Sequence, residues 1–249
     1  MTKKAAPGLA SRKALQRGVC KLTHRIQYQL LAPLFEYPDA EYPDRVKDIN
    51  DYLSGRYADA AQELSRFIEL LPSDDVQAMQ ELFTRSFDVQ AATTLDIGYV
   101  LFGDDYKRGI LLANLNREHR NASIDTGTEL ADYIPNLLRL MAVMEDEEVL
   151  QDLAYAILGP ALLEMIGEFS TERIQKREVS YQKHYKTLIE APAVASDAVT
   201  LYQFALKSLY AVLKQDFALI ERMPLKRSVD FLASVSTENE IEEAAAVNT

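Results

Sequence analysis

The apolar residues of this chain recur at helical spacing over most of its length, and this pattern constrains the fold more than any other feature. Residues three or four positions apart share one face of a helix, so each such stretch predicts an amphipathic helix. Nine glycines and nine prolines in 249 residues leave room for few turns. The sequence therefore predicts an all-α, single-domain bundle of roughly nine to eleven helices. The expected helices cover about 19–36, 42–53, 57–71, 73–87, 104–120, 132–145, 147–169, 171–190 and 197–222.

Proline, glycine and capping residues mark where these helices should bend or begin. We expect Pro33 to kink the first helix, and Gly159-Pro160 to kink or split the helix at 147–169. Ser73 is the expected N-cap of the fourth helix. Residues 88–103 are apolar without helical spacing, which indicates a packed, ordered connection rather than a helix.

Charge is divided unevenly along the chain. Residues 1–35 contain seven basic residues and no acidic one, and because the whole chain carries −11, the remainder carries −18. An acidic body repels nucleic acid and attracts basic segments of other proteins. For the basic stretch, a solvated tail is the favoured interpretation, and contact with nucleic acid or lipid headgroups is the alternative. We expect a basic flexible tail at 1–18, a helical domain at 19–235 and an acidic disordered tail at 236–249.

The cysteine content and the N-terminus bear on the compartment. The single cysteine, Cys20, cannot form an intramolecular disulfide, which fits a reducing compartment. The basic N-terminus is not followed by the apolar run of a secretory signal, and no window approaches 18 uninterrupted apolar residues. We therefore expect a cytoplasmic protein without stable membrane insertion.

Sequence signals for catalysis or metal binding are missing. None of the three histidines follows a glutamate by three positions, as a di-iron helical bundle would require. Phosphate-binding glycine loops and the G-x-S-x-G nucleophile motif do not occur. We expect a protein that is not an enzyme and that binds no cofactor stably. His119 is interpreted as a partly exposed histidine at a helix end, and a ligand role is the alternative.

Arg108 is the first unusual residue of the central region, because it extends the apolar stripe of the helix at 104–120. An arginine in that position needs a charged partner. Asp104 and Asp105 lie four and three residues earlier, within reach along the helix. In one interpretation, one aspartate caps the helix and pairs with Arg108. In the other, the spare carboxylate faces a groove and binds an arginine of a partner protein.

A second unusual segment is Glu129-Leu-Ala-Asp-Tyr-Ile-Pro135. If Asp132 is the N-cap of the next helix, Pro135 occupies position N3, where its missing N–H does no harm. Capping is the simpler interpretation of Asp132. Glu129 is not needed for that cap, and Tyr133 offers an amphipathic surface suited to recognition.

These segments resemble the NarJ branch of the TorD-like redox-enzyme maturation chaperones. The similarity lies in Phe87-Asp88, in the stretch YVLFGDDYKRG at 99–109, in ELADYIP at 129–135 and in LFEYP at 34–38. The chain departs from the family pattern at Tyr106, Lys107 and Ala131. These departures leave open whether the client is nitrate reductase or a related molybdoenzyme.

The resemblance implies an all-helical chaperone that binds the N-terminal, often twin-arginine, segment of the catalytic subunit of a dimethyl-sulfoxide-reductase-superfamily molybdoenzyme. Such a chaperone holds the apoenzyme competent for insertion of the molybdenum cofactor, which the client carries, before membrane docking or export. We expect a monomer or homodimer. The alternative is a general helical adaptor or scaffold without such a client. The residues expected to bind the client peptide are Asp88, Tyr99, Asp104, Asp105, Tyr106, Arg108, Glu129, Asp132 and Tyr133.

Overall fold

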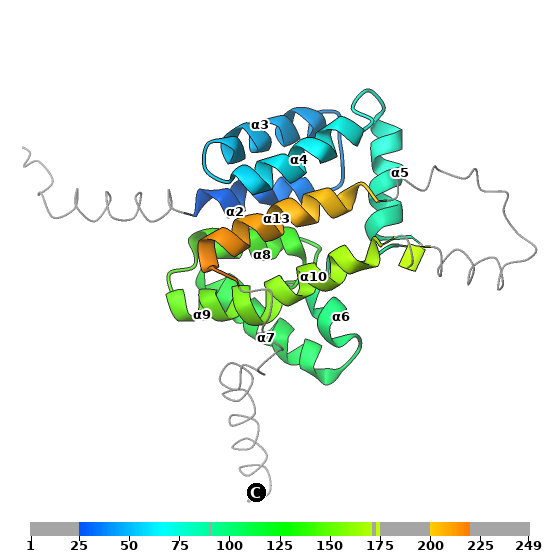
Figure 1. Cartoon of the computed structure of the whole chain (residues 1–249). Helices are drawn as coiled ribbons and strands as arrows, with labels where there is room; N and C mark the ends of the chain where they lie inside the picture. The colour runs from blue at the N-terminus through cyan, green and yellow to red at the C-terminus, as the bar shows by residue number, and fades with distance from the viewer. Residues whose placement is uncertain (1–24, 90, 171–172, 175–199, 220–249) are drawn as a thin grey trace, which may run out of the picture.

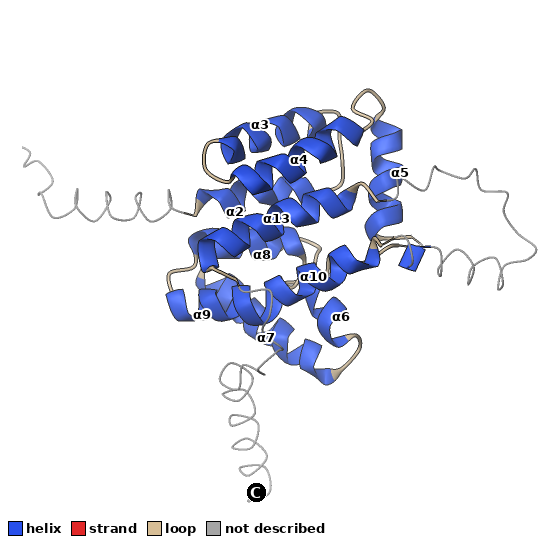
Figure 2. Ribbon diagram, viewed as in Figure 1, coloured by secondary structure: helices blue, strands red, loops and turns tan. Residues whose placement is uncertain are grey.

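The computed structural model describes residues 25–89, 91–170, 173–174 and 200–219. Within these ranges every regular element is a helix, and the one β-type contact is an isolated antiparallel bridge between Asp96 and Tyr133 (Figure 2). The prediction of an all-α fold is confirmed. The expected tails, Cys20 and nearly all of the expected helix at 171–190 lie outside the described residues. The helices are α2 (Ile26–Leu31), η1 (Ala32–Phe35), α3 (Tyr42–Ser54), α4 (Ala58–Leu70), α5 (Val76–Phe87), α6 (Ile97–Phe102), α7 (Tyr106–Asn121), α8 (Ile134–Val143), α9 (Glu147–Asp152), η2 (Leu153–Leu158), α10 (Gly159–Glu168) and α13 (Tyr202–Phe217).

Helix α13 lies at the centre of the arrangement although it comes late in the chain. It packs against α4 on one side and α10 on the other, while α2 packs against α8 (Figure 1). Helix α5 stands across the ends of these helices, and α6 and α7 lie below α10 in the same view. The described residues share one hydrophobic core.

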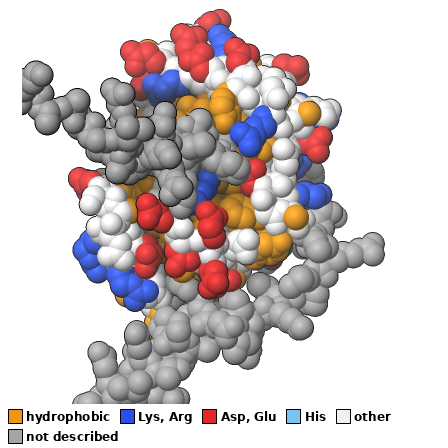
Figure 3. Space-filling view, turned by 90° about the vertical axis from the view of Figure 1, so that its left-hand side faces the viewer, with side chains coloured by type: hydrophobic (Ala, Val, Ile, Leu, Met, Phe, Trp, Pro, Cys, Tyr) orange, Lys and Arg blue, Asp and Glu red, His pale blue; other side chains and the backbone are white. Residues whose placement is uncertain are grey.

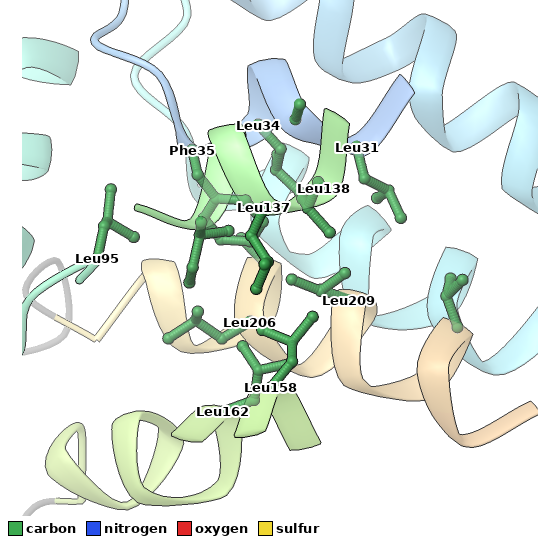
Figure 4. Close-up of a cluster of buried hydrophobic side chains, with 14 of the residues drawn as sticks. Leu31, Leu34, Phe35, Leu95, Leu137, Leu138, Leu158, Leu162, Leu206 and Leu209 are labelled. Atoms are coloured by element: carbon green, nitrogen blue, oxygen red, sulfur yellow. The ribbon is translucent and has the colours of Figure 1, made fainter. Parts of the chain in front are cut away.

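Leucine side chains from several helices meet in this core (Figure 4). Leu31 and Leu34 face Leu137 and Leu138 of α8, and Leu206 and Leu209 of α13 lie between these and α10. All of them are almost completely buried. Full burial of one leucine side chain contributes roughly 1.5–3 kcal/mol, so the apolar spacing seen in the sequence supplies the main driving force for this packing.

The hydrogen-bond pattern of the stretch from α9 to α10 changes at Gly159-Pro160, where the sequence predicted a kink or a split. The six residues before it, Leu153–Leu158, form a π-helix, and α10 begins at Gly159. Pro160 has no N–H for the α-helical bond to the fourth residue before it, and a π-turn shifts the hydrogen-bond register around such a position. By length and composition Glu147–Glu168 could cross a membrane, but half of its most apolar window is buried inside the fold.

Three local expectations need correction. The N-cap of α5 is Asp75, whose carboxylate accepts a hydrogen bond from the Ala78 N–H, and not Ser73. The connection at 88–103 contains a short helix, α6, which its apolar composition concealed. At Pro33 the first helix does not simply kink but changes from an α-helix to a 3₁₀-helix.

Candidate functional site

An open groove of about 670 Å³ lies where the end of α5, the connection that follows it, α6, the first turns of α7, and α10 come together. Apolar and polar side chains both contribute to its surface. Four carboxylates line it against a single guanidinium, so the groove is negatively charged. The lining residues are Phe87, Asp88, Ala91, Ala92, Thr93, Thr94, Asp96, Tyr99, Val100, Arg108, Glu164 and Glu168.

Arg108 ties two carboxylates together at the base of this groove. Its Nε donates to Asp132 Oδ2 at 3.0 Å, and its Nη2 donates to Asp96 Oδ2 at 3.0 Å. The Asp132 side chain is completely buried and the Arg108 side chain is 17% exposed. Such a pair is stabilising only while both partners are present, because either charge alone would be desolvated without compensation. Asp96, Arg108 and Asp132 are called the Arg108 cluster below.

The pKa values within the Arg108 cluster reflect an excess of negative charge. Burial raises the pKa of Asp96, and repulsion from Asp132 raises it further, while Arg108 partly opposes both effects. For Arg108, burial alone lowers the pKa, but the hydrogen bond to Asp132 and the charges of both carboxylates outweigh burial and raise it. Arg108 thus remains charged, and Asp96 holds a proton more readily than an ordinary aspartate.

A short antiparallel pairing brings the two carboxylates of this cluster together. The Ile97 N–H donates to the Asp132 carbonyl at 3.1 Å, and the Ile134 N–H donates to the Leu95 carbonyl at 3.0 Å. One residue of α6 must then be glycine. A Cβ on Gly98 would lie 2.5 Å from Asp132 Oδ2 and 3.2 Å from the Arg108 side chain. The absence of a side chain at position 98 therefore allows the cluster to form.

Tyr99 and α10 complete the walls of the groove. The Tyr99 ring is 45% exposed and lies 5.4 Å from the Arg108 guanidinium carbon, a cation–π contact. Glu164 is exposed and forms no ion pair with another described residue, whereas Glu168 pairs with Arg173. Asp88, directly after α5, is also exposed and likewise forms no ion pair among the described residues. Asp88 and Glu164 are thus the carboxylates most accessible to a ligand.

The structure brings some of the predicted site residues together and separates others. Asp88, Tyr99 and Arg108 line the groove, and Asp132 lies beneath it in contact with Arg108. Tyr133 is half-buried and donates its hydroxyl to the Phe35 carbonyl. The remaining predicted residues are exposed and do not line the groove: Asp104, Asp105, Tyr106 and Glu129.

Two predicted roles in this region are wrong and one is confirmed. Arg108 pairs with Asp96 and Asp132, and not with Asp104 or Asp105. Asp132 is not the N-cap of α8, because α8 begins at Ile134 and its N-cap is Tyr133. Asp105 does cap α7, since its carboxylate accepts from the Lys107 N–H at 2.9 Å.

His119 differs from its expected exposure. It is only 2% exposed, and its two ring nitrogens lie 2.8 Å from the Leu115 carbonyl and 3.2 Å from the Asn136 carbonyl. It therefore joins α7 to α8 as a core residue. Among the described residues no group of three His, Cys, Asp or Glu side chains could hold a metal ion.

Asp96, Glu164 and Glu168 line the groove but were not predicted from the sequence. Glu164 and Glu168 are four residues apart and share a face of α10, a pattern visible in the sequence but common on solvated helices. Asp96 offered no local signal, because its role depends on a contact with Arg108, twelve residues away.

Negative charge also gathers on another face of the molecule. Figure 3 shows the side at the left of Figure 1, where Asp and Glu side chains surround patches of hydrophobic ones. Residues 145–148, at the start of α9, are four exposed acids. Asp146 caps α9 and Glu147 pairs with Arg25. Acids at a helix N-terminus stabilise the helix, so this run has a structural explanation that Asp88 and Glu164 of the groove lack.

Comparison with known proteins gives one informative match. No protein-family model matches the chain. The chain is 28% identical over 127 residues to the probable nitrate reductase molybdenum cofactor assembly chaperone NarJ of Bacillus subtilis (strain 168), covering 49% of this chain and 68% of that protein. The resemblance to the NarJ-like family is confirmed. The NarJ-like relative is named as a chaperone and not as an enzyme.

Proposed function

We propose that this chain is a cytoplasmic assembly chaperone for a molybdoenzyme, and that the acidic groove binds the N-terminal segment of the client's catalytic subunit. The similarity to a NarJ chaperone supports the class of function. The observation that carries the site is the groove itself, which is lined by four carboxylates and by several apolar side chains. A segment with basic residues followed by apolar ones matches both properties.

Electrostatics favours a basic ligand at the edges of the groove. Asp88 comes from the end of α5 and Glu164 from α10, so the two accessible carboxylates border the groove from different elements. Each could accept charge-assisted hydrogen bonds from an arginine of the client. Such a bond contributes roughly 1.5–3 kcal/mol when shielded from water and less at an exposed position.

In this proposal the Arg108 cluster leaves no unbalanced positive charge at the base of the groove. The charge of Arg108 is already balanced by Asp96 and Asp132, so it does not repel a basic segment. Arg108 also contacts the Tyr99 ring, and Tyr99 lines the groove together with the apolar residues Phe87, Ala92 and Val100. In this proposal Asp132 and Arg108 position the groove, and Asp88, Tyr99 and Glu164 contact the ligand.

Binding at the N-terminus of the client would delay its membrane docking or export while the molybdenum cofactor is inserted. The affinity must exceed the cost of ordering an extended segment, and a dissociation constant between roughly micromolar and nanomolar meets this need. The client carries the cofactor, so the chaperone needs none of its own.

Calorimetry with a synthetic peptide tests the proposal. The probe is a twin-arginine peptide of about 20 residues, with two adjacent arginines before an apolar stretch. We expect the wild-type chain to bind it and the Asp88→Asn/Glu164→Gln variant to bind at least about tenfold more weakly, a loss of about 1.4 kcal/mol. The control variant Asp48→Asn/Asp51→Asn removes the same charge from exposed positions of α3 and should bind normally.

Two outcomes would contradict the proposal. Equal binding by the groove variant and the α3 control would show that the groove is not the binding site. Unchanged binding of a peptide whose two arginines are replaced by glutamine would show that basic residues are not recognised, as expected of a general adaptor.

A further inference from the structure

Tyr99 gives the groove an accessible aromatic surface. Of the two aromatic side chains that line the groove among the described residues, Phe87 is 8% exposed and Tyr99 is 45% exposed. The Tyr99 N–H donates to the Asp96 carbonyl at 3.0 Å, and the Gly103 N–H donates to the Tyr99 carbonyl at 2.8 Å, so α6 fixes its backbone. The Tyr99 hydroxyl makes no hydrogen bond with another described residue. The hydroxyl is therefore not needed to hold the ring in the groove.

The Arg108 guanidinium shows how this region holds an arginine side chain. Its central carbon lies 5.4 Å from the centre of the Tyr99 ring, while its Nε and Nη2 donate to Asp132 and Asp96. A guanidinium can do both at once, because it is flat and carries its N–H donors around its edge. A lysine ammonium has neither the flat face nor the fixed fork of donors. The combination of one ring and several carboxylates therefore suits arginine better than lysine.

We propose that the groove selects arginine over lysine in its ligand, and that Tyr99 is the residue that determines this specificity. The guanidinium of the ligand packs on the exposed part of the Tyr99 ring, and its N–H groups bind Asp88 or Glu164. The inference rests on the proposed function, because it takes the groove to be the binding site. It deepens that function by naming the chemical group that the groove recognises.

Two carboxylates are available to complete this subsite. Asp96 and Asp132 already bind Arg108, but Asp88 and Glu164 are exposed and form no ion pair with a described residue. Helix α10, which carries Glu164, packs against α6, which carries Tyr99. A guanidinium can form two parallel hydrogen bonds with one carboxylate, whereas an ammonium acts as a point charge.

Three synthetic peptides of equal charge test this selectivity. Each has about 20 residues, with two adjacent basic residues before an apolar stretch. The basic pair is arginine in the first, lysine in the second and homoarginine, a lysine stem that ends in a guanidinium, in the third. By calorimetry we expect the arginine peptide to bind the full-length chain about tenfold more tightly than the lysine peptide, equivalent to about 1.4 kcal/mol. The homoarginine peptide should bind within about threefold of the arginine peptide, because it keeps the guanidinium.

Substitutions at Tyr99 assign the selectivity to its ring. Tyr99→Leu removes the ring and should reduce the preference for arginine over lysine to about twofold. Tyr99→Phe keeps the ring and loses only the hydroxyl, so it should keep most of the preference. The control Tyr106→Leu changes an exposed tyrosine that does not line the groove and should leave the preference unchanged. The preference compares two ligands on the same variant, so a smaller fraction of folded protein would not alter it.

The possible failures of the inference and of the proposed function are distinguishable. Equal binding of the arginine and lysine peptides by the wild type would overturn the inference and leave the proposed function intact, since the groove would still bind a basic segment. A full preference for arginine in Tyr99→Leu, or its equal loss in Tyr99→Phe, would likewise overturn the role of the ring. If the wild type bound neither peptide, the proposed function would fail together with the inference.

Discussion

Two carboxylate-centred clusters in this protein use charge in different ways. In one, Asp216 near the end of α13 accepts hydrogen bonds from Tyr28 and Gln27 at 2.7 Å and from Tyr57 at 2.9 Å. These donors are neutral and come from α2 and from the start of α4. Burial and Asp216 together raise the pKa of Tyr28, so the hydroxyl stays a donor at all ordinary pH values.

In the Arg108 cluster the donor is charged and serves two carboxylates at once. Asp132 is completely buried while Asp96 reaches the groove surface. The surplus negative charge lies next to further carboxylates and an open groove, and Asp216 does not line that groove.

From this difference we infer that the Asp216 cluster serves the fold alone, and we propose that the Arg108 cluster also serves ligand binding. A carboxylate satisfied by neutral hydroxyl and amide groups ties helices together and leaves nothing for a partner to bind. Carboxylates that outnumber the available cation at an open groove favour a further cation. The following changes separate the structural role of each cluster from ligand binding, and are ordered by the size of the expected effect.

Replacing Arg108 by methionine should destabilise the protein most. It leaves the Asp132 carboxylate buried without a cation, at a cost of about 3 kcal/mol. Urea unfolding followed by circular dichroism measures the change. The control Arg117→Met, which removes only a surface pair with Glu118, should cost less than about 0.5 kcal/mol. Similar values for the two variants would mean that the Arg108 cluster does not support the fold.

Gly98→Ala should destabilise by about 2 kcal/mol, because the new methyl group overlaps Asp132 and the surrounding side chains must shift. Gly109 provides the matched control. It lies in α7 with nothing within 4 Å of an added Cβ, so Gly109→Ala should stabilise by about 0.5 kcal/mol. If Gly98→Ala and Gly109→Ala changed the free energy of unfolding in the same direction, the close contact between Gly98 and Asp132 would be contradicted.

Tyr28→Phe should cost about 1.5 kcal/mol, the contribution of one hydrogen bond to a charged acceptor. Binding of the twin-arginine peptide should not change, since no residue of the Asp216 cluster lines the groove. Tyr52→Phe, whose hydroxyl bonds to no described residue, is the comparison and should be nearly neutral. Weaker peptide binding by Tyr28→Phe without loss of stability would argue against a purely structural role.

Asp96→Asn should have the smallest effect on stability, and the size of this effect should depend on pH. The pKa of Asp96 is raised in the folded protein, so the folded protein binds this proton more tightly than the unfolded chain does. Ionisation of Asp96 therefore costs stability as the pH rises from the pKa of an unfolded aspartate to that of the folded protein. Near pH 7 the variant should equal or exceed the wild type, by less than about 1 kcal/mol.

Below about pH 4, the pKa of an unfolded aspartate, this advantage should disappear, because the wild-type carboxyl is then protonated in both states. Unfolding curves from pH 4 to pH 7 measure the difference. A variant clearly less stable than the wild type at pH 7 would show that the Asp96–Arg108 ion pair outweighs burial and repulsion.

Local chemistry was sufficient to predict most of the described helices, with α6 as an exception, and one of the caps. The α3 and α4 ranges and the cap at Asp105 follow from spacing and residue type within a few positions. The error at Ser73 has the same local nature, since Asp75 is an equally good cap two residues later.

The centre of the candidate site could not be predicted in this way. Arg108 was correctly expected to need a carboxylate, but the search covered only one helical turn. Its partners, Asp96 and Asp132, lie 12 and 24 residues away and arrive through the bridge between Asp96 and Tyr133. Gly98 gives no sign of its role in the sequence, because that role depends on how closely Asp132 approaches α6.

Recovery of a client from the native host tests the central claim most directly. Tagged wild-type chain, the Asp88→Asn/Glu164→Gln variant and the Asp48→Asn/Asp51→Asn control are purified, and co-purifying proteins are identified by mass spectrometry. We expect a molybdoenzyme catalytic subunit with the wild type and the control, and about tenfold less of it with the groove variant. Equal recovery with all three chains would contradict the groove as the client site, and absence of any molybdoenzyme subunit would contradict the chaperone function itself.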